Sequence, residues 1–375
     1  MSPVEFIDLK AQRQHLGARL DAAILDVVEA GQFIQGPQVA ALERALEAFS
    51  GARHAITCGN GTDAIGLTLM ALGLKPGDAV LVPSFTFAST AEAVAWLGAV
   101  PVFVEVEDST FTIDPAGLAA GFAAARTANL RPRALIAVDL FGQPADYDAI
   151  EAFCTHNDLI LICDAAQSFG ATYRDRPVGA IGRATTTSFF PSKPLGCYGD
   201  GGAILTNDDN LATCLRSLHV HGRGADKYDN VRIGMNSRLD TIQAAILLEK
   251  LAIFRDEIAL RQAVAARYHD GLAGAATLPA LRNGATSVWA QFTLRVPQGR
   301  RQAFMADLKA QGIPTAIYYP KPLHRQTAYR HFPIAGNELP LSDTLADEVV
   351  ALPMHPYLDE AAQASIIAAV RDRLR

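Results

Sequence analysis

The stretch ALIAVDLFGQPADYDAIEAFCTHNDLILICDAAQ, residues 134–167, contains two short apolar runs separated by a segment with helical character. The runs ALIAV (134–138) and LILIC (159–163) are apolar at every position, without the alternation of a half-exposed strand. Strands of this kind belong to parallel sheets that helices cover on both faces. The stretch therefore predicts a strand–helix–strand unit of an α/β fold, with the helix over residues 146–157.

The same alternation extends through the first 220 residues. Further apolar runs predict strands at HAITC (54–58), AVLVP (79–83), PVFVEV (101–106), TTTSFF (185–190) and GAILT (202–206). Helical patterns fit between them over residues 62–72, 89–97, 115–125 and 208–218, after N-terminal helices. We therefore expect a mostly parallel sheet in a large domain.

The pattern changes after a long helical segment that runs from Asp240 toward Gly271. VWAQFTLRV (288–296) alternates like a half-exposed strand, and a helix at 300–311, a strand TAIYY (315–319) and a helix at 358–374 follow. We predict a large domain over residues 1–250 and a smaller α+β domain over residues 251–375.

Composition narrows the class of protein. The 375 residues include 33 basic and 39 acidic side chains, for a net charge of −6, so no global positive field favours nucleic acid. The five cysteines include no CxxC pair, which predicts reduced thiols and no metal site. The N-terminus has no signal-peptide pattern, and no apolar run reaches about 18 residues. We expect a soluble cytoplasmic protein without a membrane span.

Ligands of open α/β sheets bind beyond the carboxyl ends of the strands, so the residues that follow each strand are the candidates for a site. Asp164 follows LILIC and Lys193 follows TTTSFF. A lysine in a desolvated pocket has a lowered pKa and serves as nucleophile and base, and Pro191 and Pro194 restrict the backbone around Lys193. The alternatives are an aspartate that caps the turn after its strand and a surface lysine in a loop.

The segment GNGTDA, residues 59–64, is a glycine-rich turn that opens a helix. Backbone N–H groups at such a position attract phosphate, and the hydroxyl of Ser188 could add to the same site. The alternative is an ordinary loop with Thr62 as the helix N-cap. A nicotinamide dinucleotide site is disfavoured because the next strand ends in Ser84 and lacks the acidic residue that binds ribose.

Phe85 and Phe87 follow another strand, where an aromatic ring could stack on a flat heterocycle or pack in the core. A phosphate cup, a stacking ring, a carboxylate and a lysine at strand ends together fit pyridoxal 5'-phosphate (PLP). That cofactor requires a lysine for its Schiff base and an acid that keeps its pyridine nitrogen protonated.

The segments NGTDA, TFASTAEAV, DAAQSFGA, SFFPSKPLGCYGDGGAI and NSRLDTIQAAIL resemble the sugar-nucleotide aminotransferases of the DegT/DnrJ/EryC1/StrS type. These are fold type I PLP enzymes, related to aspartate aminotransferase, and the resemblance extends from EFIDLK (5–10) to LPMHPYL (352–358). The motifs SFFPSKPLGCYGDGGAI and LPMHPYL are most similar to those of one branch of the family. Enzymes of that branch use glutamate to aminate C3 of UDP-2-acetamido-2-deoxy-3-oxo-glucuronate, in the synthesis of surface polysaccharide.

The resemblance implies a role for each matching residue. Lys193 would carry the cofactor, Asp164 would pair with its pyridine nitrogen, and Gln167 would hydrogen-bond its phenolic oxygen. Phe87 rather than Phe85 would stack on the ring. The phosphate would be held by Thr62 and Asp63 through their backbones, by Ser188, and by Asn236 of a neighbouring subunit, so that a homodimer is the minimal active unit. Asn236 could also serve as an N-cap of the helix that follows it.

The substrate site is the less determined part. Candidates for the anionic sugar nucleotide are Arg223, Arg238, Tyr318, Tyr319 and His324. The arginines could equally form structural ion pairs, and the other three could pack between domains. Tyr318 stands where the similar branch has a histidine, so its substrate does not transfer directly.

Three further functions remain open at this point. One is a 4-aminotransferase that acts on another keto-sugar nucleotide. The others are a regulator and a scaffold on the same fold, and the complete set of Asp164, Gln167 and Lys193 argues against both.

Overall fold

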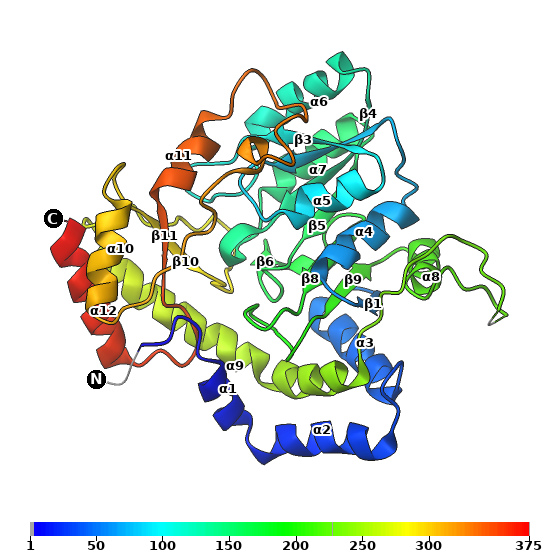
Figure 1. Cartoon of the computed structure of the whole chain (residues 1–375), viewed down its shortest axis with the longest axis horizontal. Coiled ribbons are helices and arrows are strands. Elements are labelled where there is room, and N and C mark those ends of the chain that lie inside the picture. Colours follow the sequence, from blue (N-terminus) through cyan, green and yellow to red (C-terminus); the bar gives the residue numbers. More distant parts are fainter. Residues whose placement is uncertain (1–3, 227, 375) are drawn as a thin grey trace.

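The computed structural model describes residues 4–226 and 228–374, which form a large sheet with surrounding helices, a second sheet of two strands in the C-terminal part and a third sheet of two short strands (Figure 1). The strands are β1 (His54–Cys58), β2 (Asp78–Pro83), β3 (Val100–Val104), β4 (Arg131–Val138), β5 (Ile160–Asp164), β6 (Thr172–Tyr173), β7 (Arg176–Pro177), β8 (Ala184–Ser188), β9 (Gly202–Thr206), β10 (Phe292–Arg295) and β11 (Val349–Leu352). The helices are α1 (Leu9–Leu16), α2 (Ala18–Ala30), α3 (Pro37–Ser50), α4 (Gly61–Ala71), α5 (Ser89–Trp96), α6 (Leu118–Thr127), α7 (Tyr147–His156), α8 (Asp209–Leu218), α9 (Thr241–Leu272), α10 (Arg301–Ala310), α11 (Pro340–Glu348) and α12 (Glu360–Leu374).

The large sheet has the order β1-β9-β8-β5-β4-β2-β3. The neighbours from β8 to β3 are parallel, whereas β9 is antiparallel to both β1 and β8. β1 therefore points the same way as the parallel strands. The carboxyl ends of β1, β2, β5 and β8 lie along one edge of the sheet, which is the edge at which the site was predicted. The expectation of a mostly parallel α/β sheet is confirmed.

The helices of the large sheet lie where the sequence predicts them, within three residues at either end. Residues 115–117 are the exception, since they form a short 3-10 turn that leads into α6, begun by the side chain of Asp114.

Two expectations about the second half of the chain are wrong. TAIYY is not a strand: only Ala316 pairs with the second sheet, in an isolated bridge to Ala351. β10 is not half-exposed, because Phe292, Thr293 and Leu294 are all fully buried between neighbouring elements. The pattern misled because Thr293 and Gln291 are polar residues that nevertheless lie inside.

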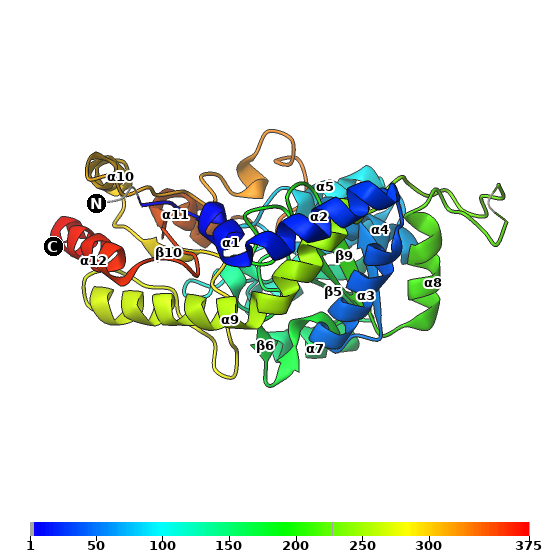
Figure 2. The same cartoon turned by 90° about the horizontal axis from the view of Figure 1, so that it is seen from below.

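Helix α9 runs along the molecule (Figures 1 and 2), and its side chains belong to two hydrophobic cores. Its first half packs Leu247 and Phe254 with the core beneath the large sheet, and its second half packs Val264 and Tyr268 with β10, β11, α10 and α12. The segment around α11 packs through Leu345 on a third hydrophobic core, which includes Val80 of β2 and Leu135 of β4. The domain boundary at residue 250 remains a proposal. Helix α9 contributes residues to both cores, so no single residue of the helix separates them.

The segment between α8 and α9 projects from the body of the molecule in both views (Figures 1 and 2). Val231 and Ile233 in this segment are 53% and 91% exposed. No helix within residues 4–226 and 228–374 has the length and apolarity required to span a membrane.

Candidate functional site

A cavity of about 570 Å³ opens at the carboxyl edge of the large sheet. The structure brings nine of the predicted residues together in its wall: Thr62, Asp63, Phe87, Asp164, Gln167, Ser188, Lys193, Tyr318 and Tyr319. They come from the ends of β1, β2, β5 and β8 and from the segment before α11. The fold brings these residues to one cavity although Thr62 and Tyr319 are 257 residues apart in sequence.

Asp164 and Lys193 face the same cavity from neighbouring strands, β5 and β8. Asp164 is only 5% exposed, and its Oδ1 accepts a hydrogen bond from the N–H of Ala166 at 3.0 Å. The turn-capping role of this aspartate is therefore also realised. Burial raises the pKa of Asp164, and the N–H of Ala166 and the charge of Lys193 oppose that rise. Burial likewise lowers the pKa of Lys193, against the attraction of Asp164.

This pair of shifts has a chemical consequence. An amine with a lowered pKa has a larger neutral, nucleophilic fraction near pH 7. A buried carboxylate that lacks a full cationic partner favours a protonated heterocycle placed against it.

The turn at the start of α4, where we expect the phosphate to bind, is fixed by a hydrogen bond to its N-cap. Asn60, not Thr62, is the N-cap, and its Oδ1 accepts from the N–H of Asp63 at 2.8 Å. The backbone donor predicted for Asp63 is thus already used, whereas the N–H groups of Gly61 and Thr62 lie in the first turn, ahead of intrahelical bonding. A Cβ on Gly61 would lie 2.7 Å from Cβ of Ser188, so only glycine allows the turn to approach β8 this closely.

Ser237 fixes this turn from the segment before α9. Its hydroxyl accepts from the N–H of Gly59 at 2.9 Å and donates to Oδ2 of Asp63 at 2.7 Å. Sequence reasoning missed Ser237 because it lies 174 residues from Asp63. The side chain of Asp63 therefore has a structural role in this turn.

Gln167 and the two aromatic residues shape the other side of the cavity. Oε1 of Gln167 accepts from the N–H of Phe141 at 2.7 Å, and its Nε2 lies 3.3 Å from the hydroxyl of Tyr319. Phe87 is 55% exposed and lines the cavity, whereas Phe85 is fully buried in the core. The ring of Tyr319 lies 6.0 Å from that of Phe87.

Four predicted residues lie outside the wall of this cavity. His324 is buried, with Nδ1 2.6 Å from the hydroxyl of Ser84 and Nε2 3.3 Å from Asp343, which matches the packing alternative. Arg223, Asn236 and Arg238 lie between α8 and α9, where Arg238 is only partly exposed between the buried Ser237 and Leu239. Asn236 is exposed and is not an N-cap, since Asp240 precedes α9.

The cavity also contains residues that were not predicted, namely Ser89, Glu92, Trp96, Asp200 and Gln291. Glu92 and Trp96 lie one turn apart on α5, and this i, i+4 spacing after Phe87 could have revealed them.

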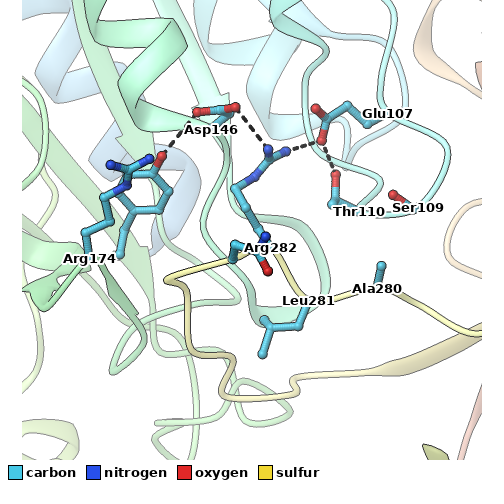
Figure 3. Close-up of a pocket in the computed structure, with 10 residues that line it drawn as sticks. Glu107, Ser109, Thr110, Asp146, Arg174, Ala280, Leu281 and Arg282 are labelled. Carbon is cyan, nitrogen blue, oxygen red and sulfur yellow. Dashed lines mark hydrogen bonds and ion pairs between the residues drawn. The ribbon is translucent and has the colours of Figure 1, made fainter.

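A second cavity of about 490 Å³ lies elsewhere and contains none of the predicted residues (Figure 3). Arg282 extends between Glu107 and Asp146 there, and its Nη1 donates to Asp146 at 3.0 Å. Because its central arginine is neutralised by two carboxylates and it contains no lysine, this cavity does not match the predicted chemistry.

Residues 14–371 match the sequence model of the DegT/DnrJ/EryC1/StrS aminotransferase family. The chain belongs to this family. It is 48% identical over 369 residues to the UDP-2-acetamido-2-deoxy-3-oxo-D-glucuronate aminotransferase of Pseudomonas aeruginosa, covering 98% of this chain and 99% of that protein. It is 39% identical to the UDP-N-acetyl-3-dehydro-α-D-glucosamine 3-aminotransferase of Acidithiobacillus ferrooxidans, covering 99% of this chain and 98% of that one. A crystal structure of a DegT DnrJ EryC1 StrS aminotransferase from Brucella abortus superposes with a TM-score of 0.96, at 50% identity and 99% coverage of both chains.

Members of the DegT/DnrJ/EryC1/StrS family are PLP-dependent transaminases that act on sugars, and so is this enzyme. The fold is accordingly fold type I. The residues present fit the cofactor: the start of α4 and Ser188 offer N–H and hydroxyl groups for a phosphate on one wall of the cavity, and Asp164 and Lys193 line the same cavity.

Proposed function

We propose that this aminotransferase transfers the amino group of glutamate to C3 of a UDP-linked 3-oxo-N-acetylglucosaminuronate, in nucleotide-sugar biosynthesis for surface polysaccharide. The observation that carries the proposal is the 48% identity, over nearly the full length of both chains, to an enzyme named for that substrate. The second relative described above is also named for a 3-oxo UDP sugar.

Four residues of the cavity would have distinct tasks in this reaction. Bound PLP supplies the electron sink that stabilises the substrate carbon when it loses a proton. With PLP bound, Asp164 would hold the protonated pyridine nitrogen, Gln167 would hydrogen-bond the phenolic oxygen, and Phe87 would stack on the ring. Lys193 would hold the cofactor covalently and, once its amine is free, would serve as the general base and acid that moves the proton. The same groups serve both half-reactions, so glutamate and the sugar bind in turn.

The charges in the cavity leave the substrate's anionic groups without local partners. Asp63, Glu92, Asp164 and Asp200 line it, and Lys193 is the cation among its described lining residues. A UDP-linked uronate carries a diphosphate and a carboxylate, which require positive or hydrogen-bonding groups. We assign the hydrogen-bonding contribution to Tyr318 and Tyr319, which line the cavity, and the positive contribution to Arg223 and Arg238, which do not line it in the same chain.

A homodimer reconciles these positions. Part of the segment between α8 and α9 projects from the body (Figure 1), and the exposed Val231 and Ile233 of this segment favour burial against protein. In the proposed dimer, Asn236 of one subunit reaches the phosphate in the neighbouring cavity.

The five cysteines are all free, and on this basis we propose that the enzyme works in the reducing cytoplasm.

The decisive experiment supplies PLP, ¹⁵N-glutamate and the UDP-linked 3-oxo uronate, which is generated in place because such ketones are unstable. Mass spectrometry detects a ¹⁵N-containing sugar nucleotide, and NMR locates the nitrogen at C3. Parallel reactions contain 4-keto sugar nucleotides or alanine in place of glutamate. Amination at C4 of another sugar would overturn the substrate assignment, and equal use of alanine would overturn the assignment of glutamate as donor.

Gel filtration with light scattering measures the assembly, and a monomer that remains fully active contradicts the dimer.

A further inference from the structure

The loop that carries Lys193 is closed on itself at its base. The N–H of Lys193 donates to the carbonyl of Phe190 at 2.8 Å, and the N–H of Cys197 donates to the carbonyl of Phe189 at 2.8 Å. A Cβ on Gly196 would lie 2.6 Å from the carbonyl oxygens of Phe190 and Pro191. The two sides of the loop are therefore in close contact, and the position of Gly196 determines where Lys193 stands.

Lys250, on α9, reaches the base of this loop from behind. Its side chain is 1% exposed, and its Nζ donates to the carbonyl oxygen of Gly196 at 2.6 Å. The same ammonium lies 4.3 Å from the centre of the Tyr198 ring, at a distance suited to a cation–π interaction. A buried lysine is costly unless its donors find partners, so these contacts account for its position.

Gln243 contacts the same loop two helical turns earlier on α9. Its Oε1 accepts from the N–H of Tyr198 at 2.8 Å, and its Nε2 donates to the carbonyl of Tyr198 at 3.4 Å. Residues 243 and 250 lie on one face of the helix because seven residues make almost two full turns. α9 thus binds both the carbonyl of Gly196 and the backbone of Tyr198.

We propose that Lys250, with Gln243, is a positioning residue for Lys193. By binding the carbonyl of Gly196, Lys250 holds the loop in the one conformation that directs the amine of Lys193 into the cavity and keeps it desolvated. Lys250 does not touch the cavity itself and takes no part in proton transfer. The role concerns the cofactor-binding lysine, so it stands or falls independently of which sugar is the substrate.

The surroundings of Lys250 support a positioning role over a purely stabilising one. Two titratable groups raise the pKa of Lys250 against the effect of its burial. They are Glu257 on the same helix and the thiol of Cys197 in the loop. Glu257 has other partners, since it accepts from Gln12 at 2.9 Å and from the hydroxyl of Tyr357 at 2.6 Å. Removing the ammonium therefore leaves no buried carboxylate without partners. A methionine at position 250 would remove the cost of desolvating an ammonium and would leave the carbonyl of Gly196 without this donor, so two opposing effects on stability partly cancel.

The test substitutes Lys250→Met, which keeps the volume and removes the donor. In the cofactor-free protein we expect a melting temperature within about 3 °C of wild type, because the exchanged interactions nearly balance. The dissociation constant for PLP should rise about tenfold, as for loss of one hydrogen bond from a charged donor. The pKa of Lys193 should move up toward its ordinary value as the loop opens to water, which slows acylation of Lys193 at pH 7.5, measured by peptide mass spectrometry.

Two further variants sharpen the test. Lys250→Gln keeps an N–H donor on a shorter side chain and should restore part of the PLP affinity and of the Lys193 reactivity. Lys309→Met, at an exposed position on α10, is the matched control and should change neither. The proposal is overturned if Lys250→Met binds PLP and labels Lys193 as wild type does. It is equally overturned if the melting temperature falls strongly while the labelling rate of Lys193 stays the same, since Lys250 would then be structural only.

Discussion

Gly61→Ala is the substitution whose effect the structure defines most closely. The new Cβ would lie 2.7 Å from Cβ, 3.2 Å from Oγ and 3.3 Å from Cα of Ser188. Ordinary carbon contacts begin near 3.4 Å, so the start of α4 and the end of β8 must separate by about 0.7 Å. Rotation of the Ser188 hydroxyl would not relieve this contact, because the closest atom is Cβ, which is fixed to the backbone.

That displacement exceeds what the phosphate site tolerates. Hydrogen bonds to oxygen span roughly 2.7–3.2 Å, so a shift of this size breaks those made by the N–H groups of α4 or by the hydroxyl of Ser188. Loss of one hydrogen bond to a charged group costs about 1.5–3 kcal/mol. We therefore expect the dissociation constant for PLP to rise roughly 10- to 150-fold.

Titration of the cofactor-free protein with PLP, followed by absorbance, measures this constant directly. Gly66→Ala is the control, since it lies in the same helix and its Cβ would meet Trp96 at an ordinary 3.5 Å. This control should change PLP affinity less than about twofold and should slightly favour the helix. If Gly61→Ala binds PLP as tightly as wild type, the close approach of α4 to Ser188 is not the phosphate site.

Three further predictions concern other groups. Lys193→Ala should keep its fold by circular dichroism but lose nearly all turnover, and after treatment with PLP and borohydride its mass should not increase at this peptide; normal turnover would remove Lys193 from the mechanism. Asp164→Asn should retain the cofactor yet lose activity by at least about a hundredfold, since a neutral amide cannot hold a protonated pyridine nitrogen, and a wild-type rate contradicts that role. Burial, with Arg261 nearby, lowers the pKa of His355 to about 4, so between pH 6.5 and 4 the unfolded chain binds more protons than the folded one. The free energy of unfolding of the cofactor-free protein should therefore fall by up to about 3 kcal/mol as the pH decreases through this window, and His355→Gln should flatten that dependence in urea titrations.

The sequence was sufficient for what depends on strand ends. Asp164, Lys193 and Phe87 each follow an apolar run, and a parallel sheet necessarily places such residues along one edge. The order of the strands was not required to predict that they meet. Their local geometry follows from the same short segments, as the capping contact of Asp164 with Ala166 shows.

Contacts made by remote segments could not be predicted in this way. Ser237 and Lys250 have no distinctive local pattern, and both act through backbone atoms of loops that lie 54 or more residues away. Nothing in a single sequence pairs a lysine in a long helix with the carbonyl of a glycine. The N-cap of α4 was misassigned for a more local reason. Asn60 and Thr62 are both favourable N-cap residues, and the choice between them requires the residue at which the helix begins, which is Gly61.

The glycines after Lys193 illustrate how the antiparallel strand β9 builds the site. From sequence, Gly199, Gly201 and Gly202 could either approach a ligand or turn the chain. A Cβ on Gly202 would lie 2.5 Å from the backbone carbonyl of Asn60. Because β9 runs against its neighbours, Gly202 begins the strand at the edge where β1 and β8 end, and it pairs with Cys58 and Ser188.

A larger residue at position 202 would therefore push the turn before α4 away from the sheet. Gly201 meets Leu239 and Phe189 in the same manner, and Gly199 faces Gln243. These glycines thus serve close packing of protein against protein. The turn that we propose to bind phosphate can approach Ser188 because β9, inserted between β1 and β8, begins with a residue that has no side chain.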